Sequence, residues 1–350
     1  MPRRRASHAL QKSLRSLLPL ARPRSRAAPR RRAAKTSPRS GPKPVSTGVW
    51  VGGTHLGPTG GRAYEVYLPA GLRRRSRVPV VVLLHGCGQT PSEFAKATRF
   101  AAAADRNGFL LVLPHQQAHH QPQRCWHWYD AAHQRRGAGE PAAIAGIIRQ
   151  VAAEQTRWRV NPARIYVAGL SAGGAMALTV GAAYPDLVAA VGVHSAPAYR
   201  SSARPTQALS AMAARTEVPP PLPGAAAIPP TIVVQGRADT VVRPGNGDRI
   251  ADQWLAHRAA AGDAVGRSRA SGGRTTDGRR YDVLRWFGPR GRKVFEYWLV
   301  DDLGHAWSGG RPKGSFSDPD GPRATTLMWS FFRLHALDVR AARQEHAAGA

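Results

Sequence analysis

Short apolar runs alternate with longer segments of helical character along most of the chain. Apolar and β-branched runs predict strands at 64–68, 80–84, 110–113, 164–168, 187–193, 231–235 and 294–300. The pattern also predicts helices at 94–106 and 142–155, an amphipathic helix at 325–337 that closes the domain, and a flexible loop at 271–280. Because strands that alternate with helices usually form parallel sheets, we expect an α/β fold: a mostly parallel central sheet with helices on both faces.

A serine between glycines follows one of these strands, in the motif Gly169-Leu170-Ser171-Ala172-Gly173. Small residues continue beyond it, so the motif lies at a strand-to-helix turn. A nucleophilic serine must stand exposed on such a sharp turn, within reach of a histidine base, and the glycines allow the turn. The pentapeptide alone is weak evidence, since a glycine-rich chain of this length contains it by chance roughly once in five sequences. Its context therefore decides the interpretation.

Two later loops supply an acid and a histidine in the chain order that this motif requires. Asp239 follows the strand predicted at 231–235, and His305 follows the last predicted strand. Asp301 and Asp302 compete for the acid role, but they share a strand exit with His305, so we expect them to be surface or capping residues. The sequence thus predicts a serine hydrolase that forms an acyl-enzyme from an ester. Its serine attacks, His305 takes the proton, and Asp239 orients the imidazole.

The tetrahedral intermediate of such a reaction also needs N–H donors for its oxyanion. The residue after the nucleophile, Ala172, supplies one donor. The loop after the strand at 80–84 contains His85-Gly86-Cys87-Gly88-Gln89, and we expect Cys87 to supply the second. The alternative is that His85 and Gly86 merely end a strand. His194 comes too early for the expected order and is predicted to be structural.

At this point the chain resembles the poly(3-hydroxybutyrate) depolymerase-like esterases, whose relatives act on feruloyl and acetyl esters of plant polysaccharides. The resemblance covers roughly residues 47–337 and implies an α/β-hydrolase fold that needs no cofactor, with Ser171, Asp239 and His305 in the catalytic roles. At His127 the family more often has asparagine. The motifs that carry the resemblance are His85-Gly86-Cys87-Gly88-Gln89, Cys125-Trp126-His127-Trp128-Tyr129, Gln134-Arg135-Arg136-Gly137, Gly139-Glu140-Pro141, Gly169-Leu170-Ser171-Ala172-Gly173-Gly174 and Gly304-His305-Ala306-Trp307-Ser308-Gly309-Gly310.

Four aromatic residues lie in these motifs and are candidates for substrate binding. Trp126, Trp128, Tyr129 and Trp307 together could line a cleft or a platform for a hydrophobic polyester chain. The alternative is that aromatics alternating along a strand pack in the core. Trp307 is the strongest candidate because it stands beside the predicted base.

The two cysteines and the histidine-rich segment admit more than one interpretation. Cys87 and Cys125 both lie in motifs at the rim of the predicted site, where they form either one disulfide or two buried thiols. His115 and His119 have H-x-x-x-H spacing, with His120 beside them. This segment is predicted to be a loop and lacks the glutamate of the zinc-protease motif, so we expect no metal.

Composition divides the chain into a tail, one domain and a flexible end. Residues 1–46 contain no Asp or Glu and are expected to form a disordered basic tail. Residues 47–337 are long enough for one hydrolase domain, in which the Pro- and Ala-rich segment 196–230 is a candidate cap or lid, and 338–350 is an expected flexible C-terminus. The apolar stretch at 14–21 is too short for a transmembrane helix and makes a poor signal-peptide core. The resemblance implies an extracellular or periplasmic protein, whereas the lack of a clear signal peptide favours the cytoplasm or another export route.

The formal net charge of +30 points to contact between the basic tail and an anionic surface. Lysine supplies only six of the 51 basic residues, so the excess of arginine also fits a GC-rich coding bias, and we expect no specific nucleic acid partner. Three functions remain. The first is hydrolysis of short-chain polyhydroxyalkanoate or its oligomers, and the second is hydrolysis of feruloyl or acetyl esters on polysaccharide. The third is polyanion binding by a non-catalytic protein that keeps the fold.

Overall fold

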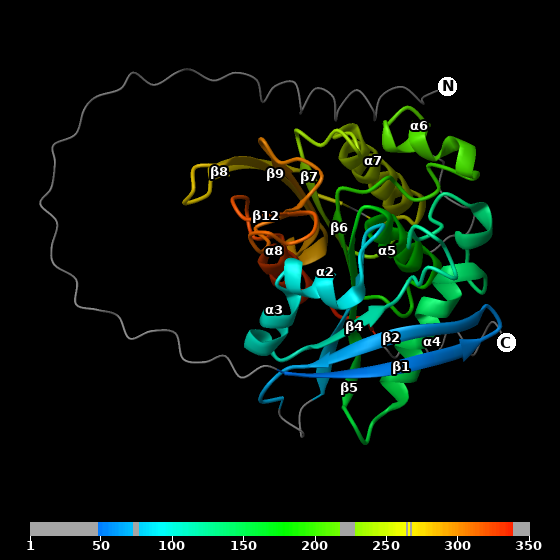
Figure 1. Cartoon of the computed structure of the whole chain (residues 1–350). Helices are drawn as coiled ribbons and strands as arrows, with labels where there is room; N and C mark the ends of the chain where they lie inside the picture. Colours follow the sequence, from blue (N-terminus) through cyan, green and yellow to red (C-terminus); the bar gives the residue numbers. More distant parts are fainter. Residues whose placement is uncertain (1–47, 73–76, 218–227, 264, 267, 339–350) are drawn as a thin grey trace, which may run out of the picture. The chain divides into compact units, whose positions relative to one another are not determined.

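A single large sheet forms the centre of the fold. The computed structural model describes residues 48–72, 77–217, 228–263, 265–266 and 268–338. In this part of the chain the sheet has ten strands, in the order β1-β2-β4-β3-β5-β6-β7-β10-β9-β8 (Figure 1). The strands are β1 (Val49–Gly57), β2 (Gly60–Leu68), β3 (Val78–Leu84), β4 (Leu110–Pro114), β5 (Val160–Leu170), β6 (Ala190–His194), β7 (Thr231–Gly236), β8 (Arg269–Arg274), β9 (Arg280–Phe287) and β10 (Lys293–Val300).

The predicted mostly parallel sheet is confirmed. Strands β4, β3, β5, β6, β7 and β10 pair in parallel with their neighbours. Antiparallel hairpins, β1–β2 and β8–β9, extend the two edges. Because the carboxyl ends of parallel strands meet at one edge of a sheet, the loops that follow β3, β5, β7 and β10 come together there. These loops carry the residues that the sequence analysis assigned to the site.

Helices cover both faces of this sheet, as the sequence pattern predicts. Figure 1 shows α2, α3 and α8 on one side and α4, α5 and α7 on the other. A small parallel sheet, β11 (Trp307–Ser308) and β12 (Ser317–Asp318), lies between β10 and α8 in sequence. The helices are α2 (Pro91–Ala97), α3 (Phe100–Asn107), α4 (Gly139–Ala153), α5 (Ala172–Ala183), α6 (Ala208–Met212), α7 (Gly245–Ala260) and α8 (Ala324–Phe332), with short 3-10 turns at Ala131–His133, Pro205–Gln207 and Pro289–Gly291.

The layer between the sheet and α2, α3 and α8 is the larger aromatic part of the core. Phe94, Phe100 and Trp307 are fully buried there and meet edge to face, with ring centroids 5.7 and 5.8 Å from Trp307. Edge-to-face pairs add about 0.5–1.5 kcal/mol to what burial itself contributes. The segment that follows β10 is thereby fixed against α2 and α3.

The helix expected at 94–106 is two helices, so that prediction was wrong in one respect. Helix α2 ends at Thr98, whose hydroxyl donates back to the carbonyl of Phe94 at 2.8 Å. Arg99 then has a φ of 64°, in the left-handed region, and α3 starts at the next residue. A non-glycine residue in this region costs roughly 1 kcal/mol or more, and the surrounding contacts must hold it. No glycine or proline marks this break in the sequence.

The prediction of a flexible loop at 271–280 is also wrong, because 271–274 and residue 280 lie in strands and the segment forms part of the β8–β9 hairpin. The tail at 1–46 and the end at 339–350 lie outside the described residues, as does 218–227 of the candidate cap. The rest of that cap segment contains the 3-10 turn at Pro205–Gln207 and α6. Among the described helices, none is both long and apolar enough to cross a membrane.

Candidate active site

Ser171 occupies a sharp turn between β5 and α5. Its φ is 56°, and its N–H donates to the carbonyl of His194 on the neighbouring strand at 2.9 Å. The flanking glycines are required by close backbone approach: a Cβ on Gly169 would lie 2.3 Å from the carbonyl carbon of Gly173, and a Cβ on Gly173 would lie 2.1 Å from the carbonyl oxygen of Leu84. The sequence folds this way because only glycine fits at both positions. Ser171 thus stands at the strand-to-helix turn that the motif predicts.

Asp239 and His305 lie against each other on the loops after β7 and β10. The Nδ1 atom of His305 is 2.9 Å from Oδ2 of Asp239. The other oxygen, Oδ1, accepts from the N–H groups of Val241 and Val242 at 3.0 and 2.8 Å. Burial raises the pKa of Asp239, but the hydrogen bond and charge of His305 and the hydrogen bond from the Val242 N–H lower it by more. The pKa of Asp239 therefore lies below its ordinary value. The carboxylate is therefore ionised and oriented toward the imidazole.

Neither competing acid forms an ion pair with His305 among the described residues, where the acidic partner of His305 is Asp239. Asp301 pairs with the guanidinium of Arg237. The carbonyl of Asp302 accepts from Arg279 at 3.1 Å. The structure therefore places Asp239, and neither of these residues, beside His305.

A second histidine lies behind this pair. His194 is fully buried, its Nε2 accepts the N–H of Ser308 at 3.0 Å, and its Nδ1 is 3.1 Å from the hydroxyl of Ser195. Burial lowers the pKa of His194 to about 3, so the ring is neutral. Ser195 also hydrogen-bonds to Asp239. His194 thus has the structural role that we expected, and it supports the loop that carries the acid.

Trp307 was wrongly predicted to contact substrate. It is fully buried, stacks on His194 with ring centroids 5.0 Å apart, and its Nε1 donates to the hydroxyl of Thr325 at 3.1 Å. Trp126 needs the same correction: it is fully buried, and its Nε1 donates to the carbonyl of His85 at 3.0 Å. A buried indole N–H needs a hydrogen-bond partner, and each of these two finds one outside its own segment. Both indoles therefore stabilise loops of the site from within the core.

The loop after β3 presents Cys87 at the site. Within this loop the N–H of Gly86 donates to Oε1 of Gln89 at 2.9 Å, and the N–H of Gly88 donates to the carbonyl of Gln123 at 2.8 Å. Among the backbone hydrogen bonds of the described residues, none uses the N–H of Cys87. The N–H of Ala172 belongs to the first turn of α5, where intrahelical partners are lacking. The structure joins Cys87 to Cys125 in a disulfide, which ties this loop to the 125–129 segment.

Ser171 and His305 open into one cavity of about 430 Å³. Trp128 and Tyr129, two of the four predicted aromatic contacts, belong to its wall. Sequence reasoning missed several other members, which come from loops and from the candidate cap. The cavity is lined by Gly86, Cys87, Gln89, Gln123, Cys125, Trp128, Tyr129, Leu170, Ser171, Ala172, Pro197, Ala208, Met212, Val241, Val242, His305 and Phe316.

A buried glutamate network lies beside this cavity. Glu140 accepts from the N–H of His127 at 2.7 Å and lies 2.9 Å from Nδ1 of the same histidine. Burial raises the pKa of Glu140, but His127 lowers it more, and Glu140 in turn raises the pKa of His127. In the described residues these two and His133 are the group whose ligand-type atoms lie within 4.8 Å of one another, whereas His115, His119 and His120 form no such group. Both oxygens of Glu140 are hydrogen-bonded, so we treat the cluster as a polar network that supports the 125–129 segment.

Known proteins with similar sequences are esterases and depolymerases. A poly(3-hydroxyalkanoate) depolymerase C from Paucimonas lemoignei is 28% identical over 198 residues, which is 54% of this chain and 46% of that protein. A feruloyl esterase B from Neurospora crassa is 32% identical over 142 residues, 41% of this chain and 46% of that protein. An acetylxylan esterase A from Talaromyces purpureogenus is 26% identical over 210 residues, 55% and 53% of the two chains. The chain thus spans about half the length of the curated relatives it matches.

Solved structures show the same fold. The acetyl xylan esterase from Aspergillus awamori aligns over 82% of this chain and 100% of its own, with a TM-score of 0.63 and 19% identity. An S-formylglutathione hydrolase from Agrobacterium tumefaciens aligns over 82% of this chain and 96% of its own, with a TM-score of 0.51 and 17% identity. These likenesses establish the α/β-hydrolase fold. The model of one family, described as esterase PHB depolymerase, matches residues 62–278, more than half of the chain, and the chain therefore belongs to that family.

Proposed function

We propose that this protein is a serine carboxylic-ester hydrolase whose preferred substrate is short-chain polyhydroxyalkanoate or its oligomers. The observation that carries the proposal is the convergence of three strand-end loops: Ser171 on its turn and His305, paired with Asp239, open into one cavity. Membership of the family and the names of the relatives support the reaction class.

In the proposed reaction the hydroxyl of Ser171 attacks the ester carbonyl. Nε2 of His305 takes the hydroxyl proton and then gives it to the leaving alcohol, while Asp239 fixes the tautomer and stabilises the imidazolium. The N–H groups of Ala172 and Cys87 are the proposed donors to the oxyanion, and one such donor is worth roughly 10²- to 10³-fold in kcat. Water then attacks the acyl-enzyme by the same route in reverse, so no cofactor is required.

The wall of the cavity favours an apolar acyl chain. Trp128, Met212, Val241 and Phe316 present apolar side chains around Ser171, and no Asp, Glu, Lys or Arg is among the described residues that line it. A polyester of short hydroxy acids offers methyl branches and ester groups without charge, which matches such a wall. We therefore place polyhydroxyalkanoate esters first.

Feruloyl or acetyl esters of polysaccharide are the second candidate. Trp128 and Tyr129 provide ring faces and edges on which a ferulate ring could stack, and two of the relatives carry feruloyl esterase or acetylxylan esterase in their names. A non-catalytic polyanion-binding protein is the third, and the filled Ser171, Asp239 and His305 positions argue against it. An extracellular or periplasmic location stays a prediction.

The deciding experiment compares a 3-hydroxybutyrate oligomer with a feruloyl ester as substrates for the purified chain. Three proteins are tested: wild type, Ser171→Ala, and Ser330→Ala as a matched control at an exposed position on α8. We expect release of hydroxybutyrate by the wild type and the control, and none by Ser171→Ala. Preferential release of ferulate would move the substrate to polysaccharide esters. Undiminished turnover by Ser171→Ala would overturn the mechanism.

A further inference from the structure

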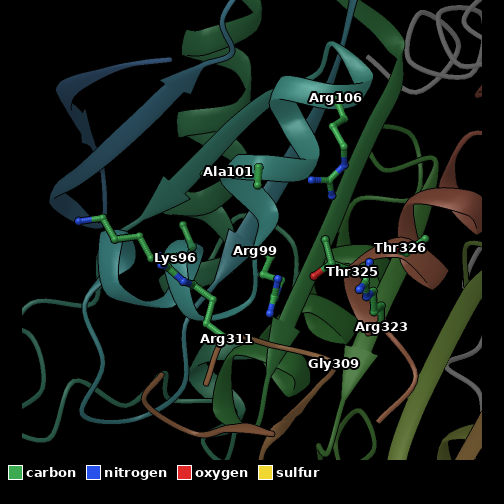
Figure 2. Close-up of a pocket in the computed structure, with 11 residues that line it drawn as sticks. Lys96, Arg99, Ala101, Arg106, Gly309, Arg311, Arg323, Thr325 and Thr326 are labelled. Atoms are coloured by element: carbon green, nitrogen blue, oxygen red, sulfur yellow. The ribbon is translucent and has the colours of Figure 1, made fainter. Parts of the chain in front are cut away.

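A second pocket, of about 280 Å³, lies outside the candidate active site and shares no lining residue with its cavity. It is formed where the turn between α2 and α3 meets the start of α8 and the loop after β11 (Figure 2). Five cationic side chains line it: Lys96, Arg99, Arg106, Arg311 and Arg323. They come from three separate parts of the chain, 96–106, Arg311 and Arg323, which the fold brings together.

Among the described residues the four arginines form no ion pair with an acid, whereas the charge of Lys96 acts on Glu65 and Glu93 and favours the ionised form of both. No Asp or Glu is among the residues that line the pocket. None of the ion pairs of the described residues involves any of the five. Elsewhere in the chain, by contrast, arginines such as Arg237 and Arg279 each pair with two carboxylates. The four arginines therefore concentrate positive charge that no ion pair of the described residues balances.

Arg99 is the most enclosed of the five. Its Nε donates to the carbonyl of Gly310 at 3.0 Å, which holds the guanidinium at the pocket. Burial lowers the pKa of Arg99, and the charges of Arg323, Arg311 and Arg106 lower it further. In Figure 2 the side chains of Arg99, Arg106 and Arg323 turn toward the same space. Mutual repulsion of this kind is relieved when an anion enters.

Two helix N-termini add to the positive potential. The first turn of α3 contributes Ala101 and Ala102 to the wall, and the first turn of α8 contributes Thr325 and Thr326. The N–H groups of a helix's first turn lack intrahelical partners and carry the positive end of the helix dipole. The hydroxyl of Thr325 is already bonded to Trp307 and to the carbonyl of Thr98, and the N–H of Thr326 donates to the carbonyl of Arg323 at 2.9 Å. The backbone N–H of Thr325 is therefore what these two threonines offer.

We propose that this pocket is a binding site for a phosphate-bearing ligand, a small oligophosphate with two or three linked phosphate groups. Guanidinium groups match the oxygens of phosphate bidentately, and helix N-termini are common phosphate sites. An oligophosphate carries enough charge to be shared among four arginines, and a recess, in place of a flat basic face, suits a compact ligand. A phospholipid headgroup offers the same phosphate chemistry from a second source.

Binding at this pocket also bears on the segment that follows His305. Gly309 and Arg311 belong to that segment, and the N–H of Arg311 donates to the carbonyl of Ala97 at 2.8 Å. An anion that bridges Arg311 to Arg99 and Arg323 would tie this segment to α3 and α8. Because a ligand that binds only the folded state stabilises it, the melting temperature should rise with ligand concentration.

The test uses the full-length protein and sodium tripolyphosphate as the probe, measured by titration calorimetry in low salt. Three proteins are compared: wild type, the pocket variant Arg311→Gln/Arg323→Gln, and the control Arg149→Gln/Arg157→Gln. The control removes the same charge at exposed positions where each arginine lies over an aromatic ring, Tyr184 and Trp158. We expect 1:1 binding by wild type and control, at least tenfold weaker binding by the pocket variant, and unchanged ester turnover by all three without ligand.

Equal affinity of the wild type and the pocket variant, or equal weakening of both double variants, would overturn the proposal, because either result means that the charge of the whole chain binds the probe. If the double variant does not fold, Arg106→Glu serves as the second variant, since Arg106 is exposed near the end of α3. Vesicles of phosphatidylglycerol distinguish the two sources of phosphate. If the wild type binds these vesicles but not tripolyphosphate, and the pocket variant does not bind the vesicles, the ligand is a lipid phosphate and the proposal of a free oligophosphate is overturned.

Discussion

Removal of the disulfide should lower the stability of the protein by an amount that follows from its position in the chain. The bond between Cys87 and Cys125 closes a loop with a sequence separation of 38. In the chain-entropy relation, closing a loop of this length restricts the unfolded state by about 4 kcal/mol at 25 °C. We therefore expect the variant Cys87→Ser/Cys125→Ser to have a free energy of unfolding about 4 kcal/mol below that of the wild type.

The assay is urea unfolding followed by tryptophan fluorescence, with and without reductant. These two cysteines are the only ones in the sequence, so reductant can act on no other bond. The reduced wild type should coincide with the double variant, and the double variant itself should not respond to reductant. The same loop carries Cys87, which lines the cavity and is the proposed oxyanion donor, so ester turnover should fall mainly in kcat.

A loss of stability below about 1 kcal/mol would refute the entropic reasoning, since it would mean that the unfolded chain is not measurably restricted by the cross-link. An unchanged kcat in a folded double variant would separately refute the proposed role of the Cys87 loop in positioning an oxyanion donor. The two readouts are independent, because one measures the unfolded state and the other measures the geometry of the folded site.

Four further substitutions test the site and its support. Asp239→Asn should lower kcat by about 10⁴-fold with an unchanged circular dichroism spectrum, because asparagine holds the wrong tautomer of the histidine. His127→Asn should destabilise the protein less as pH rises. The pKa of His127 is raised in the folded state, so its stabilising contribution is complete below an unfolded pKa of about 6.5 and is lost as pH rises through the folded pKa. Melting temperatures of both proteins from pH 5 to 8 measure this difference. Trp307→Ala should destabilise the protein by about 3–5 kcal/mol in urea unfolding. Trp128 is also buried but lines the cavity, so Trp128→Ala should raise KM in addition to lowering stability.

Each of these expectations has a result that contradicts it. Retention of a tenth of the wild-type kcat by Asp239→Asn would remove the acid from the mechanism. A stability difference between wild type and His127→Asn that stays constant across the pH range would show that the pKa of this histidine does not change on folding. A Trp307→Ala variant with unchanged stability and a raised KM would show that Trp307 contributes to substrate binding.

The parts of the fold that the sequence predicted are those with a strong local signal. Buried parallel strands such as β3 and β7 are continuous runs of β-branched and apolar residues, and each was located within a few residues. The β8 strand, Arg269–Arg274, consists of arginine, serine, alanine and glycine at an exposed edge, and its partner β9 supplies the pairing. Its composition is that of a loop, so the strand follows from backbone pairing that no local pattern records.

The site shows the same division. The positions of Ser171, Asp239 and His305 could be predicted because each lies on the turn or loop that follows a strand, and parallel strands end together. The roles of Trp126 and Trp307 could not, because each indole is held by a partner remote in sequence, at His85 and at Thr325. Met212 at the end of α6 and Phe316 on a loop also line the cavity, and their places depend on chain paths that periodicity does not describe.

The break between α2 and α3, which the sequence did not predict, also forms part of the proposed phosphate-binding pocket. A continuous helix through 94–106 would carry Arg99 within its interior, on a face set by the helical repeat. The left-handed conformation of Arg99 ends α2, redirects the chain and gives α3 a free first turn beside the guanidinium. The Arg99 hydrogen bond to Gly310 then connects this turn to the segment after His305. A backbone conformation that costs about 1–3 kcal/mol is expected to persist where the surrounding structure holds it, commonly at a functional site, and here it creates both the cationic recess and its contact with the proposed catalytic loop.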